Sequence, residues 1–149
     1  MQAEPSRTVA RPALQSTQQM IGRYPVEKLL AQGGMGAVYL GTHPDLSVPV
    51  AIKVIKPEMA DDEGITRFGR EARALWVLNH PNLLRCYDVD LKADRPYIVM
   101  PFIDGETLDK TMMRRKAKGD LLWRVRMLRD LCLGVAIMHS NGMVHRDLK

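Results

Sequence analysis

The stretch Gln32-Gly33-Gly34-Met35-Gly36-Ala37-Val38, followed downstream by Val50-Ala51-Ile52-Lys53, decides how this chain folds. Glycines between two apolar runs form a tight turn, and they let backbone N–H groups approach phosphates without interference from side chains. Taken alone, such a turn more often marks only a tight hairpin. The β-branched run that contains Lys53 predicts a further strand after the turn.

Lys53 supports the interpretation of the glycine turn as a phosphate-binding turn. An ammonium group among β-branched residues is costly to bury unless an anion accompanies it, and an exposed strand edge is the alternative interpretation. Helical spacing from about Asp61 to Asn79 places Phe68 and Leu75 on one face, and Glu71 shares that face. We therefore predict an ion pair between Lys53 on the strand and Glu71 on the helix.

The spacing of apolar residues along the rest of the chain predicts an α+β protein. Strands are expected from Tyr24 to the glycine turn, and over Ala37–Leu40, Val48–Ile55, Leu83–Val89 and Tyr97–Met100. Further helices are expected near Gly105–Leu108 and from Leu121 to Met138, the second ending at Asn141-Gly142.

Composition sets the broad class of the protein. A chain of 149 residues with 46% apolar residues can build the core of a globular domain. The net charge of +5 permits binding to phosphates or nucleic acid, but only 5% of residues are aromatic and no nucleic-acid-binding fold is recognised, so no nucleic-acid partner is expected. Cys86 and Cys132 lack the spacing of metal ligands, and no metal site is predicted from them.

The two ends of the chain carry further expectations. Residues 1–20 hold few large apolar groups and are expected to form a disordered leader. The longest apolar run, Leu131–Met138, is too short to cross a bilayer, and no signal peptide is visible. These features predict a cytoplasmic protein without a membrane segment.

The last residues, His145-Arg146-Asp147-Leu148-Lys149, complete a specific order of motifs. A lone His-Arg-Asp tripeptide occurs by chance, but here it follows the glycine turn, the strand lysine and the helix glutamate. With these elements in order, the chain from about Tyr24 to Lys149 resembles a protein kinase. It is most similar to bacterial serine/threonine kinases of the eukaryotic (Hanks) type, through Gly33-Gly34-Met35-Gly36 and Arg67-Phe68-Gly69-Arg70-Glu71-Ala72. Lys149, two residues after Asp147, is the choice of serine/threonine kinases.

The resemblance implies a fold, a function and cofactors. Residues 21–100 would form a small lobe, with a five-stranded antiparallel sheet and one regulatory helix, residues 101–104 a hinge, and residues 105–149 the first helices of a large lobe. The implied function is phosphoryl transfer from ATP to serine or threonine of a protein substrate, with ATP and Mg²⁺ as cofactors. The alternative is a non-catalytic module that binds a nucleotide or docks on a partner.

The resemblance also assigns roles to residues. Leu30, Val38 and Ala51 would line the adenine pocket, Met100 would be the gatekeeper, and the Pro101 carbonyl and Ile103 N–H would face the adenine edge. The turn would cover the phosphates with Ala31, Gln32, Gly33, Gly34, Met35, Gly36 and Ala37. Lys53, oriented by Glu71, would reach the α- and β-phosphates, and Asp147 would accept or orient the proton of the substrate hydroxyl, with Lys149 in the same catalytic set.

Two departures from the family pattern lead to further expectations. Ala31 replaces the first glycine of the family motif, and it would be strained by roughly 1 kcal/mol or more if that position required a positive φ. The metal ligands of the family would lie beyond Lys149, so negligible kinase activity is expected of the isolated chain, and no metal ligand is assigned within it. The apolar helix Leu121–Met138 would lack most of its lobe, which predicts self-association.

Overall fold

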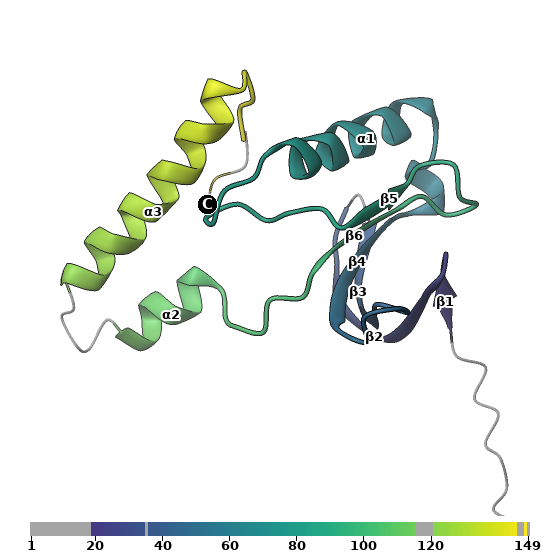
Figure 1. The fold of residues 1–149 in the computed structure, drawn as a ribbon, viewed down its shortest axis with the longest axis horizontal. Coiled ribbons are helices and arrows are strands. Elements are labelled where there is room, and N and C mark those ends of the chain that lie inside the picture. The colour runs from purple at the N-terminus through teal and green to yellow at the C-terminus, as the bar shows by residue number, and fades with distance from the viewer. Residues whose placement is uncertain (1–18, 35, 116–120, 146–147, 149) are drawn as a thin grey trace, which may run out of the picture.

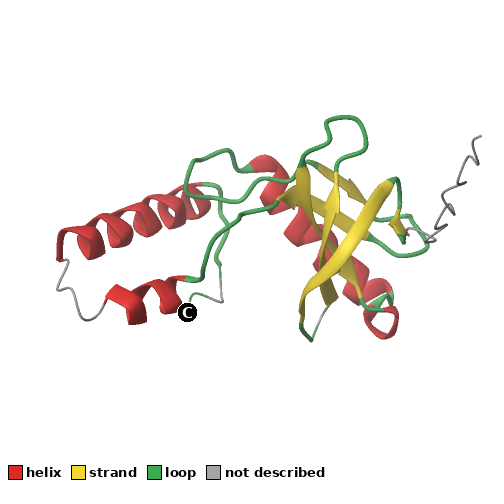
Figure 2. Cartoon of the chain, turned by 90° about the horizontal axis from the view of Figure 1, so that it is seen from below, coloured by secondary structure: helices red, strands yellow, loops and turns green. Residues whose placement is uncertain are grey.

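A single antiparallel sheet and three α-helices make up the part of the chain that the computed structural model describes, residues 19–34, 36–115, 121–145 and 148 (Figures 1 and 2). The strands are β1 (Met20–Ile21), β2 (Tyr24–Gln32), β3 (Gly36–Thr42), β4 (Pro49–Ile55), β5 (Asp88–Asp90) and β6 (Tyr97–Pro101). The helices are α1 (Asp62–Val77), α2 (Leu108–Arg115) and α3 (Leu121–Ser140), with a short 3-10 turn, η1, over Pro57–Met59. The predicted α+β class is confirmed.

The sheet runs in the order β1-β2-β3-β4-β6-β5. Five of its strands correspond to the five that the sequence predicts. The sixth, β1, is a two-residue strand in which Met20 and Ile21 pair with Pro25 and Tyr24 of β2. The chain reverses between them at Gly22, whose φ of 54° is a conformation that favours glycine.

The predicted strand over Leu83–Val89 is wrong for most of its length. Strand β5 begins only at Asp88, because backbone groups before it bond elsewhere. The Leu83 N–H donates to the His80 carbonyl in a turn, and the Cys86 N–H donates to the Leu75 carbonyl at the end of α1, 3.0 Å away. The apolar residues of this segment therefore follow the end of the helix instead of extending the sheet.

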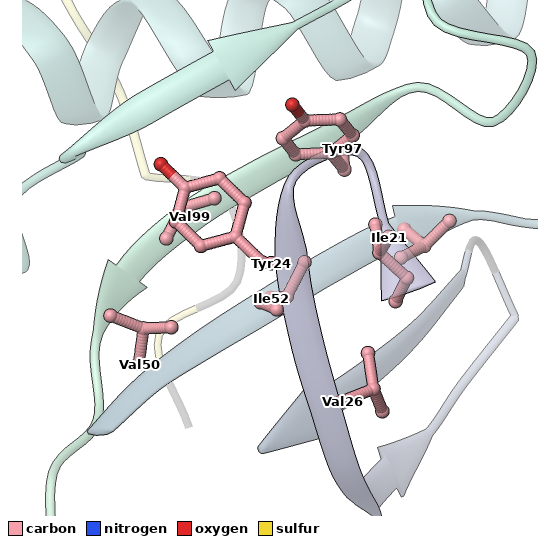
Figure 3. Close-up of a cluster of buried hydrophobic side chains, with 8 residues drawn as sticks. Ile21, Tyr24, Val26, Val50, Ile52, Tyr97 and Val99 are labelled. Atoms are coloured by element: carbon pink, nitrogen blue, oxygen red, sulfur yellow. The ribbon is translucent and has the colours of Figure 1, made fainter. Parts of the chain in front are cut away.

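Alternating side chains give the sheet two buried faces. One face holds the cluster drawn in Figure 3, formed by Ile21, Tyr24, Val26, Val50, Ile52, Val54, Tyr97 and Val99. The other face packs against α1 through Ile55, Ile98 and Met100, which meet Phe68 and Ala72 of the helix. Strands β4 and β6 are therefore packed on both faces.

Helix α1 is fixed at its start and along one face. The Asp61 side chain accepts a hydrogen bond from the Gly64 N–H at 2.7 Å, which caps the first turn, and Asp62 and Glu63 lie at the positive end of the helix dipole. Phe68 and Ala72 are buried, as the helical spacing predicts. The cap and the buried face together fix the position of Glu71 over the sheet.

Helices α2 and α3 lie side by side, away from the sheet and α1, in both views (Figures 1 and 2). Helix α3 ends close to the predicted stop, where Gly142 adopts a φ of 70° and the Met143 N–H donates to the Met138 carbonyl. Much of its apolar surface is exposed, at Leu121, Leu122, Val125, Leu128, Leu131 and Leu133. Self-association through this surface stays a prediction.

Some expectations about the ends of the chain are not tested. Residues 1–18 of the expected leader lie outside the described residues. Its last two residues are ordered, because the backbone carbonyl of Gln19 accepts a hydrogen bond from the Val26 N–H and Met20 begins β1. Among the helices of the described residues, none combines the length and the hydropathy that a membrane crossing requires.

Tyr24 links the cluster of Figure 3 to a charged network. Its side chain is fully buried, and its hydroxyl donates to Asp88 at 2.6 Å. Burial, reinforced by the hydrogen bond to the carboxylate, raises the pKa of Tyr24 from 10.0 to about 12. The folded chain therefore holds this proton more tightly than the unfolded chain does.

This shift predicts a decline in stability at alkaline pH. The pKa of tyrosine in the unfolded chain is 10.0, and the contribution of the Tyr24 shift to the free energy of unfolding is fully present below that pH. This contribution is lost as the pH rises through about 12, the pKa in the folded chain. The free energy of unfolding should fall by up to about 1.4 kcal/mol per pH unit for this one group. Urea unfolding at a series of pH values would measure it, and Tyr24→Phe should flatten the profile. An equally steep decline in the variant would contradict the assignment.

Candidate nucleotide-binding site

Lys53 and Glu71 meet between the sheet and α1, as predicted. The Lys53 Nζ lies 2.6 Å from both Glu71 oxygens, Oε1 and Oε2. The side chains are 23% and 39% exposed, so water reaches both. An ion pair of this exposure contributes little to stability, and its main effect is to hold the ammonium group in one place.

Strand register explains why Lys53 points toward α1. Lys53 lies opposite Val38 of β3 and Ile98 of β6, and Ile98 belongs to the cluster that packs against α1. Side chains opposite each other on neighbouring strands share a face of the sheet. The ammonium group therefore projects from the same face as the side chain of Val38.

Ala51, a proposed adenine-lining residue, lies one row further along this face than Val38 and Lys53. Ala51 is opposite Leu40 on one side and Met100 on the other, and Met100 is only 6% exposed. The structure thus brings Val38, Ala51, Lys53 and Met100 together on one surface. Of the other predicted adenine contacts, Leu30 lies in β2, Pro101 is the last residue of β6, and Ile103 follows that strand and is 69% exposed.

The glycine turn connects β2 to β3. Its base is closed by the pair Gln32 and Ala37 and by a hydrogen bond of 2.9 Å from the Gly33 N–H to the Gly36 carbonyl. A Cβ built on Gly33 or Gly34 would meet no atom within 4 Å, so both glycines border open space. Gly36 is different, because a Cβ there would lie 2.2 Å from the Val54 carbonyl oxygen.

Ala31 carries none of the strain that a positive φ would bring. It lies within β2 opposite Val38, and among the described residues other than glycine only Ser47 has a positive φ. The condition for strain is therefore not met, and alanine fits the extended backbone here. The pairing of β2 with β3 contains two register shifts, one of them between Leu29 and Ala31, so the ladder is irregular next to Ala31.

Several predicted site residues are not placed by the structure. Met35, Asp147 and Lys149 lie outside the described residues. Within the described residues, no group of three or more His, Cys, Asp and Glu side chains is arranged to hold a metal ion. The roles assigned to these positions stay predictions.

Asn82 is a positioning residue that sequence reasoning missed. Its side-chain Nδ2 donates to the Asp130 carbonyl of α3 at 2.6 Å, which ties the segment after α1 to the helix pair. Gly134 of α3 packs against the same segment, since a Cβ there would lie 3.2 Å from the Asn82 carbonyl oxygen. The single glycine in the sequence of α3 was the sequence signal for this close approach.

An antiparallel sheet with a glycine turn, a strand lysine and a paired helix glutamate is the arrangement that defines the small lobe of a protein kinase. A family model described as protein tyrosine and serine/threonine kinase matches residues 25–149. The chain belongs to the protein kinase family.

Curated relatives are bacterial serine/threonine-protein kinases. The chain is 37% identical over 129 residues to Pkn1 of Myxococcus xanthus, covering 86% of this chain and 18% of that protein. It is 37% identical over 131 residues to PrkC of Bacillus subtilis, covering 86% of this chain and 20% of that protein. The chain thus spans about a fifth of the length of these two relatives.

Solved structures agree with this assignment. The crystal structure of the Mycobacterium tuberculosis PknI kinase domain superimposes with a TM-score of 0.71 and 29% sequence identity. The match covers 90% of this chain and 55% of that chain. The described fold is therefore that of a kinase small lobe followed by the start of the large lobe.

Proposed function

We propose that this chain provides the ATP-binding part of a serine/threonine protein kinase. The proposed division is a small lobe over residues 21–100, a hinge over 101–104 and the start of the large lobe from 105. The observation that carries the proposal is the contact of the Lys53 Nζ with both Glu71 oxygens on the face of the sheet next to the glycine turn.

The proposed site binds ATP along this face. The adenine lies against Leu30, Val38 and Ala51, with Met100 as the gatekeeper and with the Pro101 carbonyl and the Ile103 N–H at the adenine edge. The open backbone of Gly33 and Gly34 supports this placement, because phosphates can approach N–H groups there without meeting side chains. Lys53 then neutralises part of the phosphate charge, and Glu71 keeps its ammonium group from turning away.

The catalytic part of the proposal rests on Asp147. In this family the corresponding aspartate accepts or orients the proton of the substrate hydroxyl, and we assign that role to Asp147, with Lys149 in the same catalytic set. Protein kinases use Mg²⁺ to spread the charge of the phosphates. The described residues hold no group that fits this ion, so no ligand in this chain is assigned to it.

Binding of ATP tests the first part of the proposal. Mg·ATP at about one hundred times its Kd should stabilise the chain by about 2.7 kcal/mol and raise Tm by several degrees. Differential scanning fluorimetry would measure the shift, with Mg²⁺ alone as the control. The absence of any nucleotide-dependent shift, together with no saturable binding of a fluorescent ATP analogue, would refute it.

A further inference from the structure

A recess lies on the sheet face that carries Val54, opposite the face that carries Lys53. It encloses about 180 Å³, and its floor is formed by Ala37 and Val54, both of which are buried. Its rim is polar and comes from three places in the chain: the base of the glycine turn, the segment after β4, and the turn between β5 and β6. The proposed nucleotide site does not use this recess.

Two cationic residues, Lys56 and Arg95, line the recess. Val54 is opposite Tyr97 in the sheet, and the Ile55 N–H donates to the Pro96 carbonyl at 3.2 Å. The next residues along these two segments are Lys56 and Arg95, and both line the recess. Like charges near one another repel, and an anion bound between them would relieve that repulsion.

No described residue supplies that anion. Among the ion pairs and side-chain hydrogen bonds of the described residues, none involves Lys56 or Arg95. Glu58 also lines the recess but forms no ion pair with either cation there. Two cations and one carboxylate leave the lining with a formal charge of +1. Gln32 and Tyr39 also line the recess, and their side chains carry an amide and a hydroxyl that can form hydrogen bonds.

We propose that this recess binds a phosphate monoester group, either on a small molecule or on a phosphorylated serine or threonine side chain. A phosphate monoester carries a charge of about −1.5 to −2 at neutral pH and can accept hydrogen bonds from both cations at once, whereas a carboxylate has a single charge. The apolar floor suits the carbon atoms next to the ester oxygen. A volume of about 180 Å³ is below the usual range for drug-sized ligands, which favours one phosphate group over a whole nucleotide.

Site-resolved titration of the full 149-residue chain tests the proposal. Sodium phosphate, added to ¹⁵N-labelled protein in a phosphate-free buffer of constant ionic strength, should shift the amide signals of Ala37, Lys56 and Arg95 in a saturable way. A short alanine–glycine peptide with one phosphothreonine should cause the same shifts, and its unphosphorylated form should cause none. Tighter binding of the phosphopeptide than of free phosphate would indicate a protein ligand, and the reverse order a small molecule. Shifts that do not saturate would overturn the proposal.

Charge-removing variants locate the site. Lys56→Gln and Arg95→Gln should each weaken binding by about tenfold, because each removes a charge-assisted hydrogen bond. Arg95→Lys should recover part of the loss, which separates lost charge from a folding defect. Lys92→Gln controls for overall basicity and should bind as the unmodified chain does.

The Lys53→Gln variant separates this proposal from the proposed function. It should leave the phosphate-induced shifts at Lys56 and Arg95 unchanged. If Lys53→Gln abolished binding while Lys56→Gln and Arg95→Gln did not, the phosphate would lie at the proposed nucleotide site. That result would overturn the inference and leave the ATP proposal intact.

Discussion

Lys53→Met is expected to weaken Mg·ATP binding about tenfold or more while changing the free energy of unfolding by less than about 1 kcal/mol. A hydrogen bond to a charged group is worth about 1.5–3 kcal/mol, and 1.4 kcal/mol corresponds to a factor of ten in affinity. An exposed ion pair contributes only about 0.2–1 kcal/mol to folding. Because Glu71 is 39% exposed, the loss of its partner does not leave a charge buried without water.

The same two measurements separate a binding role from a structural one. Fluorescence titration with an ATP analogue gives Kd, and urea unfolding gives stability. Lys92→Met is the matched control, because Lys92 is an exposed lysine in the turn between β5 and β6 that has no part in the proposed nucleotide site. A Lys53→Met variant that lost about 3 kcal/mol of stability but bound nucleotide normally would mean that the ion pair only supports the fold.

Local periodicity made the centre of the site predictable. Lys53 lies in a strand with a period of two, and Glu71 lies on the apolar face of a helix with a period of 3.6, so each side chain has a direction that the sequence alone indicates. The glycine turn joins β2 to β3 and places Ala31 opposite Val38, and the ladder between β3 and β4 places Val38 opposite Lys53. These contacts depend on short segments whose local secondary-structure preferences agree with the fold.

Features that depend on distant segments could not be predicted. Strand β1 is held by the burial of Ile21 against a cluster that includes Tyr97, far away in the sequence. The apolar run after Leu83 has strand propensity, but its Cys86 N–H donates to the Leu75 carbonyl at the end of α1 and not to a neighbouring strand. The presence of Lys56 and Arg95 at one recess likewise appears only once β4 and β6 are aligned.

The glycine turn offers a second large effect, because its glycines serve different purposes. Gly36→Ala should destabilise the chain by at least about 2 kcal/mol, since the new Cβ would lie 2.2 Å from a backbone oxygen of β4. Neither side of this contact can rotate away, because Gly36 pairs with Ile55 and Ala37 pairs with Val54 in the same ladder. The two strands would have to separate next to Lys53.

Gly34→Ala should instead leave stability within about 0.5 kcal/mol and weaken Mg·ATP binding several-fold. Among the described glycines only Gly22 and Gly142 have a positive φ, so alanine fits the backbone of Gly34, and its Cβ would meet no atom within 4 Å. The same Cβ would occupy the space through which a phosphate approaches the backbone N–H groups. Urea unfolding and nucleotide titration of both variants would check the contrast. Equal loss of stability in the two variants would mean that the turn needs glycine only for its fold.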